Sequence, residues 1–204
     1  MVVAIVSLIF ATTSSFAGIT GSVHDFSTQG WSAGRICTVC HTPHNASQTI
    51  AAAPLWNHKV TTATYTLYTS PTMDETTVQP LGISKLCLSC HDGTLAVDSF
   101  GDQTGSTFIS GEANIGTDLS NDHPISVSWT HQTIVGFGPQ CTNCHDQIGE
   151  DPSKFVLPFY KYAGGPAKIE CSSCHDPHNN GPPNEKLLRM SNNGSALCLT
   201  CHNR

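Results

Sequence analysis

The stretch Cys37-Thr-Val-Cys-His41 contains the motif that decides the fold of this chain. The same Cys-x-x-Cys-His pattern occupies five ranges: 37–41, 87–91, 141–145, 171–175 and 198–202. These copies use all ten cysteines, and each ends in a histidine although only 11 of the 204 residues are histidine. Cys-x-x-Cys-His is the attachment sequence of c-type haem. The sequence therefore predicts five covalently attached haem c groups.

Each copy of the motif supplies three groups to one haem. The two thiols add to the vinyl groups on one edge of the porphyrin, and the histidine binds the iron as proximal ligand. The predicted attachment residues are Cys37, Cys40, Cys87, Cys90, Cys141, Cys144, Cys171, Cys174, Cys198 and Cys201. The predicted proximal ligands are His41, His91, His145, His175 and His202.

Disulfides, a redox dithiol and zinc binding are the alternatives for these cysteines. Disulfides account for an even number of cysteines in an exported chain, but not for the histidines. A thioredoxin-like Cys-x-x-Cys occurs once, beside a βαβ pattern. Zinc sites pair such units at regular intervals, whereas the motif starts here are 50, 54, 30 and 27 residues apart. We therefore favour haem.

Six histidines outside the motifs are candidates for the second axial position of the irons. They are His24, His44, His58, His123, His131 and His178. Methionine is the usual competitor, and past the N-terminal segment only Met73 and Met190 remain. Bis-histidine ligation at all five haems is therefore the most economical interpretation. One of the six histidines is then surplus.

Two of these histidines lie only three residues after a proximal one. His44 follows His41, and His178 follows His175. Three residues span at most about 10–11 Å, too little to reach the other face of the same iron, so each is predicted to serve a neighbouring haem. His24 precedes Asp25, whose carboxylate would support its ring.

Two further candidates lie before the third motif. His131 lies ten residues before Cys141 and is the candidate for the haem attached there, with a surface histidine as the alternative. His123 lies between an aspartate and a proline that would fix the orientation of its ring.

The N-terminal segment indicates export. Residues 1–17 form a short apolar run that ends in the small-x-small pattern Ser15-Phe16-Ala17, typical of a signal peptide removed before Gly18. A retained N-terminal segment is the alternative, because no Lys or Arg precedes the run. No later run is long and apolar enough to be transmembrane. The formal net charge of −6, without a basic cluster, argues against nucleic acid as a partner.

The predicted fold class is mostly irregular coil, with a few short helices and minimal β structure around a stack of haems. A chain of 204 residues is too short to wrap five macrocycles in protein, and its 17 Gly and 12 Pro favour turns. Each motif is predicted to form one helical turn. Residues 59–70 are predicted to be extended, residues 94–101 more weakly so, and residues 185–191 helical.

An internal duplication organises the predicted domain, residues 18–204. Cys40-His-Thr-Pro-His44 matches Cys174-His-Asp-Pro-His178, and residues 84–91 match residues 195–202. The repeats predict one haem pair over 37–91 and a second over 171–202, with the haem of 141–145 inserted between them.

Seven stretches resemble the extracellular cytochrome filaments of metal-reducing bacteria, of the outer-membrane cytochrome E (OmcE) type. They are residues 19–27, 37–44, 54–58, 84–93, 118–126, 171–178 and 195–202. The resemblance implies a column of haems, a head-to-tail homopolymer, and His44 as a ligand to a haem of the neighbouring subunit. The motif at 141–145 departs from this pattern, since the family type has four haems, and would lengthen the column or branch from it.

The predicted function is electron conduction through closely stacked haems in an extracellular filament, with no catalytic residue. Its partners would be further copies of the chain and redox proteins or extracellular acceptors. The alternatives are a soluble periplasmic electron shuttle and a multihaem oxyanion reductase. A reductase needs one haem iron with a free coordination position. The six histidines outside the motifs argue against this, because they suffice to fill the second position of all five irons.

Overall fold

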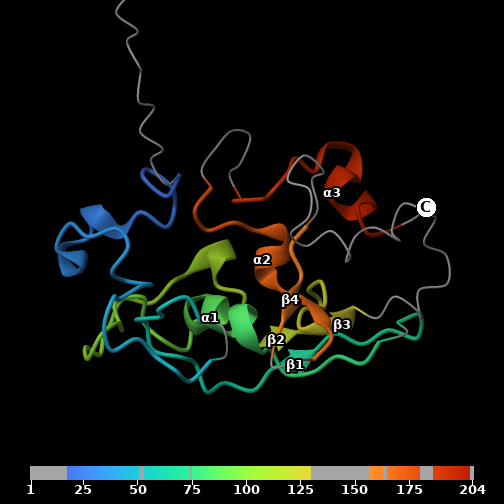
Figure 1. Cartoon of the computed structure of the whole chain (residues 1–204), viewed down its shortest axis with the longest axis horizontal. Helices are drawn as coiled ribbons and strands as arrows, with labels where there is room; N and C mark the ends of the chain where they lie inside the picture. The colour runs from blue at the N-terminus through green and yellow to red at the C-terminus, as the bar shows by residue number, and fades with distance from the viewer. Residues whose placement is uncertain are drawn as a thin grey trace, which may run out of the picture.

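The computed structural model describes residues 18–50, 53–73, 75–129, 157–162, 165–179 and 186–202 (Figure 1). Residues 1–17, predicted to be a signal peptide, lie outside this part, as does the third motif with Cys141, Cys144 and His145. His131 also lies outside the described residues.

The described helices are short, and each α-helix overlaps one of the motifs. They are α1 (Gly82–His91), α2 (Cys171–Cys174) and α3 (Ala196–Leu199). The 3-10 helices η1, η2, η3 and η5 cover Phe26–Thr28, Gly30–Ser32, Gly111–Ala113 and Asn193–Ser195. Figure 1 shows long loops between these elements. The predicted fold class of coil with a few short helices is confirmed, and the haem stack stays a prediction.

Two small sheets complete the described part. β1 (Thr66–Leu67) pairs in parallel with β2 (Asp118–Leu119). β5 (Ala167–Ile169) lies between β3 (Val127–Trp129) and β4 (Tyr160–Lys161) in an antiparallel sheet. Among the described residues, no helix has the length and hydrophobicity needed to span a bilayer.

The extended strand predicted over residues 59–70 forms only at β1. Before β1 the backbone bonds to side chains: the Thr61 N–H donates to Ser89 Oγ at 3.0 Å. At Tyr65, the side chain of Gln79 bonds both the N–H and the C=O, each at 2.9 Å. Because these side chains satisfy the backbone groups, this segment needs no partner strand.

The extended character predicted over residues 94–101 is wrong. The Asp92 carboxylate accepts hydrogen bonds from both the N–H and the hydroxyl of Thr94, each at 2.8 Å. This local bonding bends the chain directly after α1. Within residues 94–101, Phe100 forms an isolated antiparallel β-bridge with His58.

The helix predicted over residues 185–191 is wrong for residues 186–191. Leu187 has a left-handed backbone, with φ 54°. Its C=O accepts from the Asp176 N–H at 2.7 Å, and the Arg189 N–H donates to the Cys174 C=O at 2.8 Å. Tertiary hydrogen bonds to the fourth motif therefore replace the helical ones.

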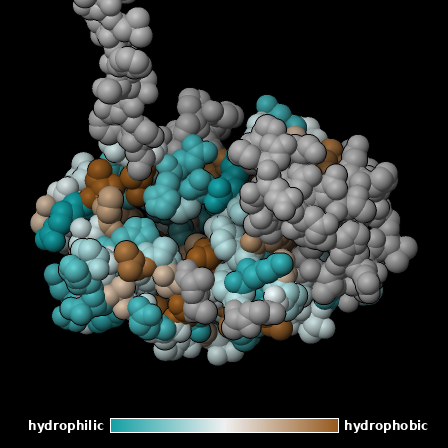
Figure 2. Space-filling model, in the orientation of Figure 1, coloured by the Kyte–Doolittle hydropathy of each residue, from teal (hydrophilic) through white to brown (hydrophobic). Residues whose placement is uncertain are grey.

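The apolar core is small. Tyr65, Leu88 and Leu119 form its buried cluster, whereas Val23 and Phe108 are 73% and 55% exposed. Figure 2 shows apolar residues in separate patches among hydrophilic ones on the face drawn. Side-chain packing alone gives this chain little stability, because stability rises with the apolar area buried.

A buried polar junction joins α1 to α2. Ser84 Oγ accepts from the Cys171 N–H at 2.9 Å, and Glu170 accepts from the Ser126 hydroxyl at 3.0 Å. Ser84, Ser126 and Glu170 are all buried. The junction brings the thiols of Cys87 and Cys171 into contact. The attachment cysteines of the second and fourth motifs therefore lie side by side.

Candidate haem-binding sites

Each of the four described motifs contains one helical turn. In three of them the histidine N–H donates to the C=O of the first cysteine: His41 to Cys37 at 2.8 Å, His175 to Cys171 at 3.0 Å and His202 to Cys198 at 2.8 Å. The fourth, residues 87–91, forms the last turns of α1. The predicted helical turn is confirmed in these four motifs. Such a turn keeps both cysteines and the histidine close together.

Three motif histidines bond a backbone carbonyl through Nδ1. The acceptors are the C=O groups of Pro54 for His41 at 2.5 Å, Ala113 for His91 at 2.8 Å and Lys186 for His175 at 2.7 Å. Metal-binding histidines commonly donate their other ring N–H in this way, which fixes the tautomer and the ring orientation. The arrangement leaves Nε2 as the nitrogen available to an iron.

Two of these carbonyls, those of Pro54 and Lys186, belong to a structural repeat that was not predicted from the sequence. Each of two motif histidines forms a β-bridge with a later residue, His41 with Trp56 and His175 with Leu188. Before each bridge partner lies a leucine, Leu55 or Leu187, and each has φ 54°. The duplication therefore includes residues 54–57 and 186–189. In the sequence, this extension of the duplication is visible only as the leucine shared at positions 55 and 187. The carbonyl acceptors leave no trace in the sequence, because any residue has a backbone C=O.

Four of the described cysteine thiols have raised pKa values, and burial raises that of Cys174. A hydrogen bond with Cys87 lowers the pKa of Cys171. Burial raises the pKa of Cys40 to about 11 and that of Cys90 to about 12. A hydrogen bond with Cys171 and then burial raise the pKa of Cys87. Zinc needs thiolates, and within the described ranges no three His, Cys, Asp or Glu side chains converge on one metal position. The zinc alternative therefore has no ligand set there.

His24 lies in a buried environment. Its Nδ1 is buried and has no hydrogen-bond partner among the described residues. Burial and then the neighbouring His91 lower the pKa of His24 to about 4, against a hydrogen bond to the Pro177 backbone. A neutral ring is the form that binds metals. The predicted support from Asp25 is wrong, because that carboxylate accepts from Gly21 and Ser27 instead.

His58 and His123 both bond backbone carbonyls. His58 is buried, with Nδ1 near the Lys59 C=O at 2.8 Å and Nε2 near the Ala96 C=O at 3.0 Å. Its Nε2 also lies 3.6 Å from Cys90 Sγ. His123 is exposed, and its Nδ1 lies 3.0 Å from the Pro124 C=O.

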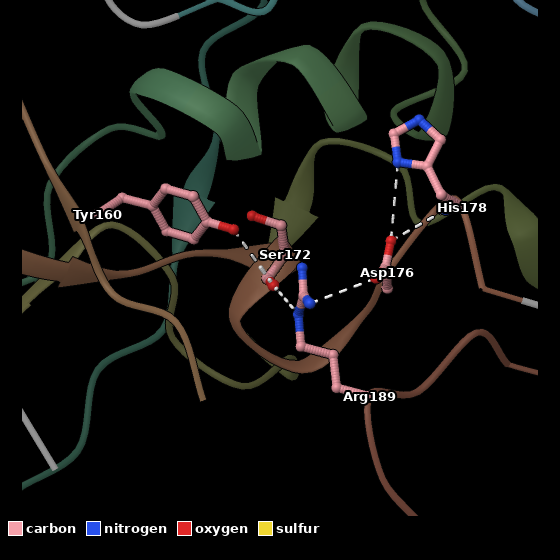
Figure 3. A network of polar contacts seen from close by, with 5 residues as sticks. All are labelled: Tyr160, Ser172, Asp176, His178 and Arg189. Atoms are coloured by element: carbon pink, nitrogen blue, oxygen red, sulfur yellow. Dashed lines mark hydrogen bonds and ion pairs between the residues drawn. The ribbon is translucent and has the colours of Figure 1, made fainter. Parts of the chain in front are cut away.

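His44 and His178 occupy equivalent positions in the duplication but differ in surroundings. His44 is exposed and borders a cavity of about 840 Å³, together with Trp56 and His58. His178 belongs to a polar network with Asp176 and Arg189 (Figure 3).

This network holds the loop after the fourth motif. The His178 N–H donates to Asp176 Oδ1 at 3.0 Å, and Asp176 Oδ2 accepts from Arg189 at 3.3 Å. Arg189 Nε donates to the Ser172 C=O at 2.7 Å, and the Tyr160 hydroxyl lies 3.5 Å from the same oxygen. The loop is therefore anchored to the helix α2 that carries the motif (Figure 3).

Three pairs of imidazoles from segments distant in sequence lie close together. The ring centroids are 6.0 Å apart for His24 and His91, 6.0 Å for His41 and His178, and 6.1 Å for His123 and His202. In each pair one ring belongs to a motif and the other does not. Each pair supplies two imidazoles, a donor set that fits haem iron. In His24 a buried ring nitrogen also has no hydrogen-bond partner among the described residues.

The comparison with family models agrees with this chemistry. Residues 163–204 match the family described as the doubled CXXCH motif. That range contains the motifs at 171–175 and 198–202. The match supports a multihaem c-type cytochrome with covalently bound haem c. A comparison with curated proteins gives no match.

Proposed function

We propose that this chain carries haem c at all five motifs and conducts electrons from one haem to the next. The observation that carries the proposal is the contact of the histidine Nδ1 with a backbone carbonyl, which recurs in three motifs, at His41, His91 and His175. Haem c supplies a one-electron iron couple when it is bound.

The residues of the chain hold and shield the irons. The two cysteines of a motif would attach one haem covalently, and the adjacent histidine would bind its iron. A histidine from outside the motif would be the second ligand to that iron, which would leave no site for a small substrate. This arrangement favours electron transfer over a reductase, which needs an open iron.

We further propose that the chain is exported and polymerises head to tail as an extracellular filament. The exposed position of His44 supports this, because a ligand for a neighbouring subunit has to lie at the surface. The seven stretches that resemble the filament-forming cytochromes also support it. The competing proposal is a periplasmic shuttle with the same haems and no polymer.

Intact-mass measurement and absorption spectroscopy of the purified exported protein test the haem proposal. We expect a mass above the polypeptide by five haems, a Soret band, and a pyridine haemochrome value of five haems per chain. A mass equal to that of the bare polypeptide would refute the proposal. Replacing Cys37 and Cys40 by Ala is the matched change, and should remove one haem.

A further inference from the structure

We propose that three haem irons are each bound between two particular imidazoles: His41 with His178, His91 with His24, and His202 with His123. This inference rests on the proposed haem attachment and specifies the second ligand of each of these irons. The spacing of the paired rings is the first observation in its support.

The centroid distances are close to, and slightly below, the distance expected for two histidines bound to one metal ion. Conjugated C–N bonds are about 1.33 Å, which places each imidazole nitrogen about 1.1 Å from the ring centre. Bonds from a first-row metal to histidine nitrogen are about 2.0–2.1 Å. Two rings in line on one metal ion therefore have centroids about 6.2–6.4 Å apart. The observed separations are 6.0, 6.0 and 6.1 Å.

The interplanar angles of 79°, 21° and 74° are all compatible with this geometry. Each axial ring is free to rotate about its metal–nitrogen bond without changing the distance between centroids. The spacing is therefore the informative quantity, and it recurs in three pairs from different parts of the chain.

The hydrogen bonds of the rings are the second observation. In His41, His91 and His123, Nδ1 lies within hydrogen-bond distance of a backbone carbonyl. Nε2 is then the nitrogen that remains to bind a metal. In His24 a buried ring nitrogen has no partner among the described residues, and such an atom requires a ligand.

The contrast between His44 and His178 is the third observation. Asp176 bonds the backbone of His178 and is itself held by Arg189. In the first copy Thr42 replaces that aspartate, and its hydroxyl donates to the His44 C=O at 2.8 Å. Both histidines are exposed. Within the described residues, the ring of His178 lies next to that of His41, whereas His44 borders the cavity that Trp56 and His58 also line.

The pairing ties the two halves of the duplication together. The haem attached at Cys37 and Cys40 receives its second ligand from His178 of the other half. His24, which precedes the first motif, serves the iron of the second. The iron of the fourth motif, at His175, then takes its second ligand from a histidine outside these pairs.

The His178→Ala variant of the full haem-loaded protein tests the first pair. We expect one iron per chain to change from low-spin to high-spin in the ferric electron paramagnetic resonance spectrum, and one carbon monoxide to bind after reduction. Asn179→Ala, one residue further along the same loop, is the control and should keep every iron low-spin. An all-low-spin spectrum of His178→Ala would overturn the pairing.

A second variant identifies the affected haem. When Cys37 and Cys40 are replaced by Ala, the haem of the first motif is absent, and adding His178→Ala should create no new high-spin iron. A new high-spin iron there would assign His178 to another haem and overturn the pairing. If His178→Ala does not fold, His178→Met replaces it, with a higher potential expected at one haem. Unchanged potentials would overturn the pairing, while absence of haem from the wild type would refute the proposed function instead.

Discussion

A single aspartate distinguishes two histidines that the sequence presents as equivalent. Both His44 and His178 end a Cys-His-x-Pro-His stretch. The residue directly after the motif differs: it is Thr42 in the first copy and Asp176 in the second. The hydroxyl of Thr42 bonds the His44 C=O, whereas Asp176 forms an ion pair with Arg189. The sequence predicts that both serve a neighbouring haem, but the surroundings of His178 depend on the contact of Asp176 with Arg189, 13 residues further along the chain.

Gly82, at the start of α1, is a second residue whose role depends on its surroundings. Its φ is +48°, and a Cβ there would overlap the ring of Tyr162. The hydroxyl of Tyr162 accepts a hydrogen bond from the Ile83 N–H at 3.0 Å. Glycine therefore allows both the left-handed backbone and the close approach of the tyrosine.

Gly82→Ala should destabilise the haem-loaded protein by about 2–6 kcal/mol, because backbone strain and a steric clash each cost about 1–3 kcal/mol. Thermal unfolding followed by circular dichroism measures the loss. Gly116→Ala is the control, since Gly116 has φ +79° but nothing within 4 Å of the added Cβ. Equal decreases in Tm for the two variants would contradict the clash with Tyr162.

Among the elements, the helical turn of each motif is what the sequence predicts best. The spacing of two thioethers and one ligand leaves little choice of local backbone, so four described motifs agree with the prediction. The strand predicted over residues 59–70 forms only at β1, and the predicted helix is absent from residues 186–191. In both segments, groups distant in sequence, such as Gln79 and Cys174, take the hydrogen bonds. Local propensity contains no information on such partners.

Glu170 links three elements at the start of α2. It follows β5, accepts from Ser126 beside β3, and caps α2 through a reciprocal pair of hydrogen bonds with Ser173. Its other oxygen, Oε1, is buried without a partner among the described residues. Burial raises the pKa of Glu170 above its ordinary value of 4.5, although Ser84, Ser126 and Lys168 oppose the shift.

Glu170→Gln should remove a pH-dependent loss of stability. The pKa of Glu170 is higher in the folded protein than in the unfolded chain. Its favourable contribution to the free energy of unfolding is therefore complete below the unfolded-state pKa, and is lost as the pH rises through the folded-state pKa. The Tm of the wild type should therefore fall from pH 4.5 upward relative to that of Glu170→Gln, by a few degrees, since about 1 kcal/mol shifts Tm by about 2–4 °C at this chain length. Parallel pH profiles would contradict the assignment, and Glu170→Ala controls for loss of the cap.

At the scale of the whole molecule, the contacts between motifs define a path that the sequence does not specify. The second and fourth motifs meet at Cys87 and Cys171. His24 lies near both His91 of the second motif and His178. The ring of His178 in turn lies 6.0 Å from that of His41 in the first motif, so these contacts connect the first and second motifs. The sequence shows how many attachment sites exist and how they repeat. Their arrangement in space depends on the α1–α2 junction, whose serines carry no distinguishing pattern.

The polymer and the shuttle differ in one surface histidine. If His44 binds an iron of the next subunit, His44→Ala should prevent filaments, because a metal bond across the interface is lost while the other contacts remain. We expect wild-type filaments by cryo-electron microscopy, and discrete subunits with unchanged haem content for the variant.

Gln48→Ala, exposed in the same loop, is the matched control for this change and should still polymerise. Native mass spectrometry distinguishes the remaining outcomes. Wild-type protein that stays a monomer at every concentration tested would favour the periplasmic shuttle. Filaments that form equally well from His44→Ala would place the subunit contact elsewhere on the surface. In both cases the pairing of His41 with His178 is unaffected, because it joins residues of one chain.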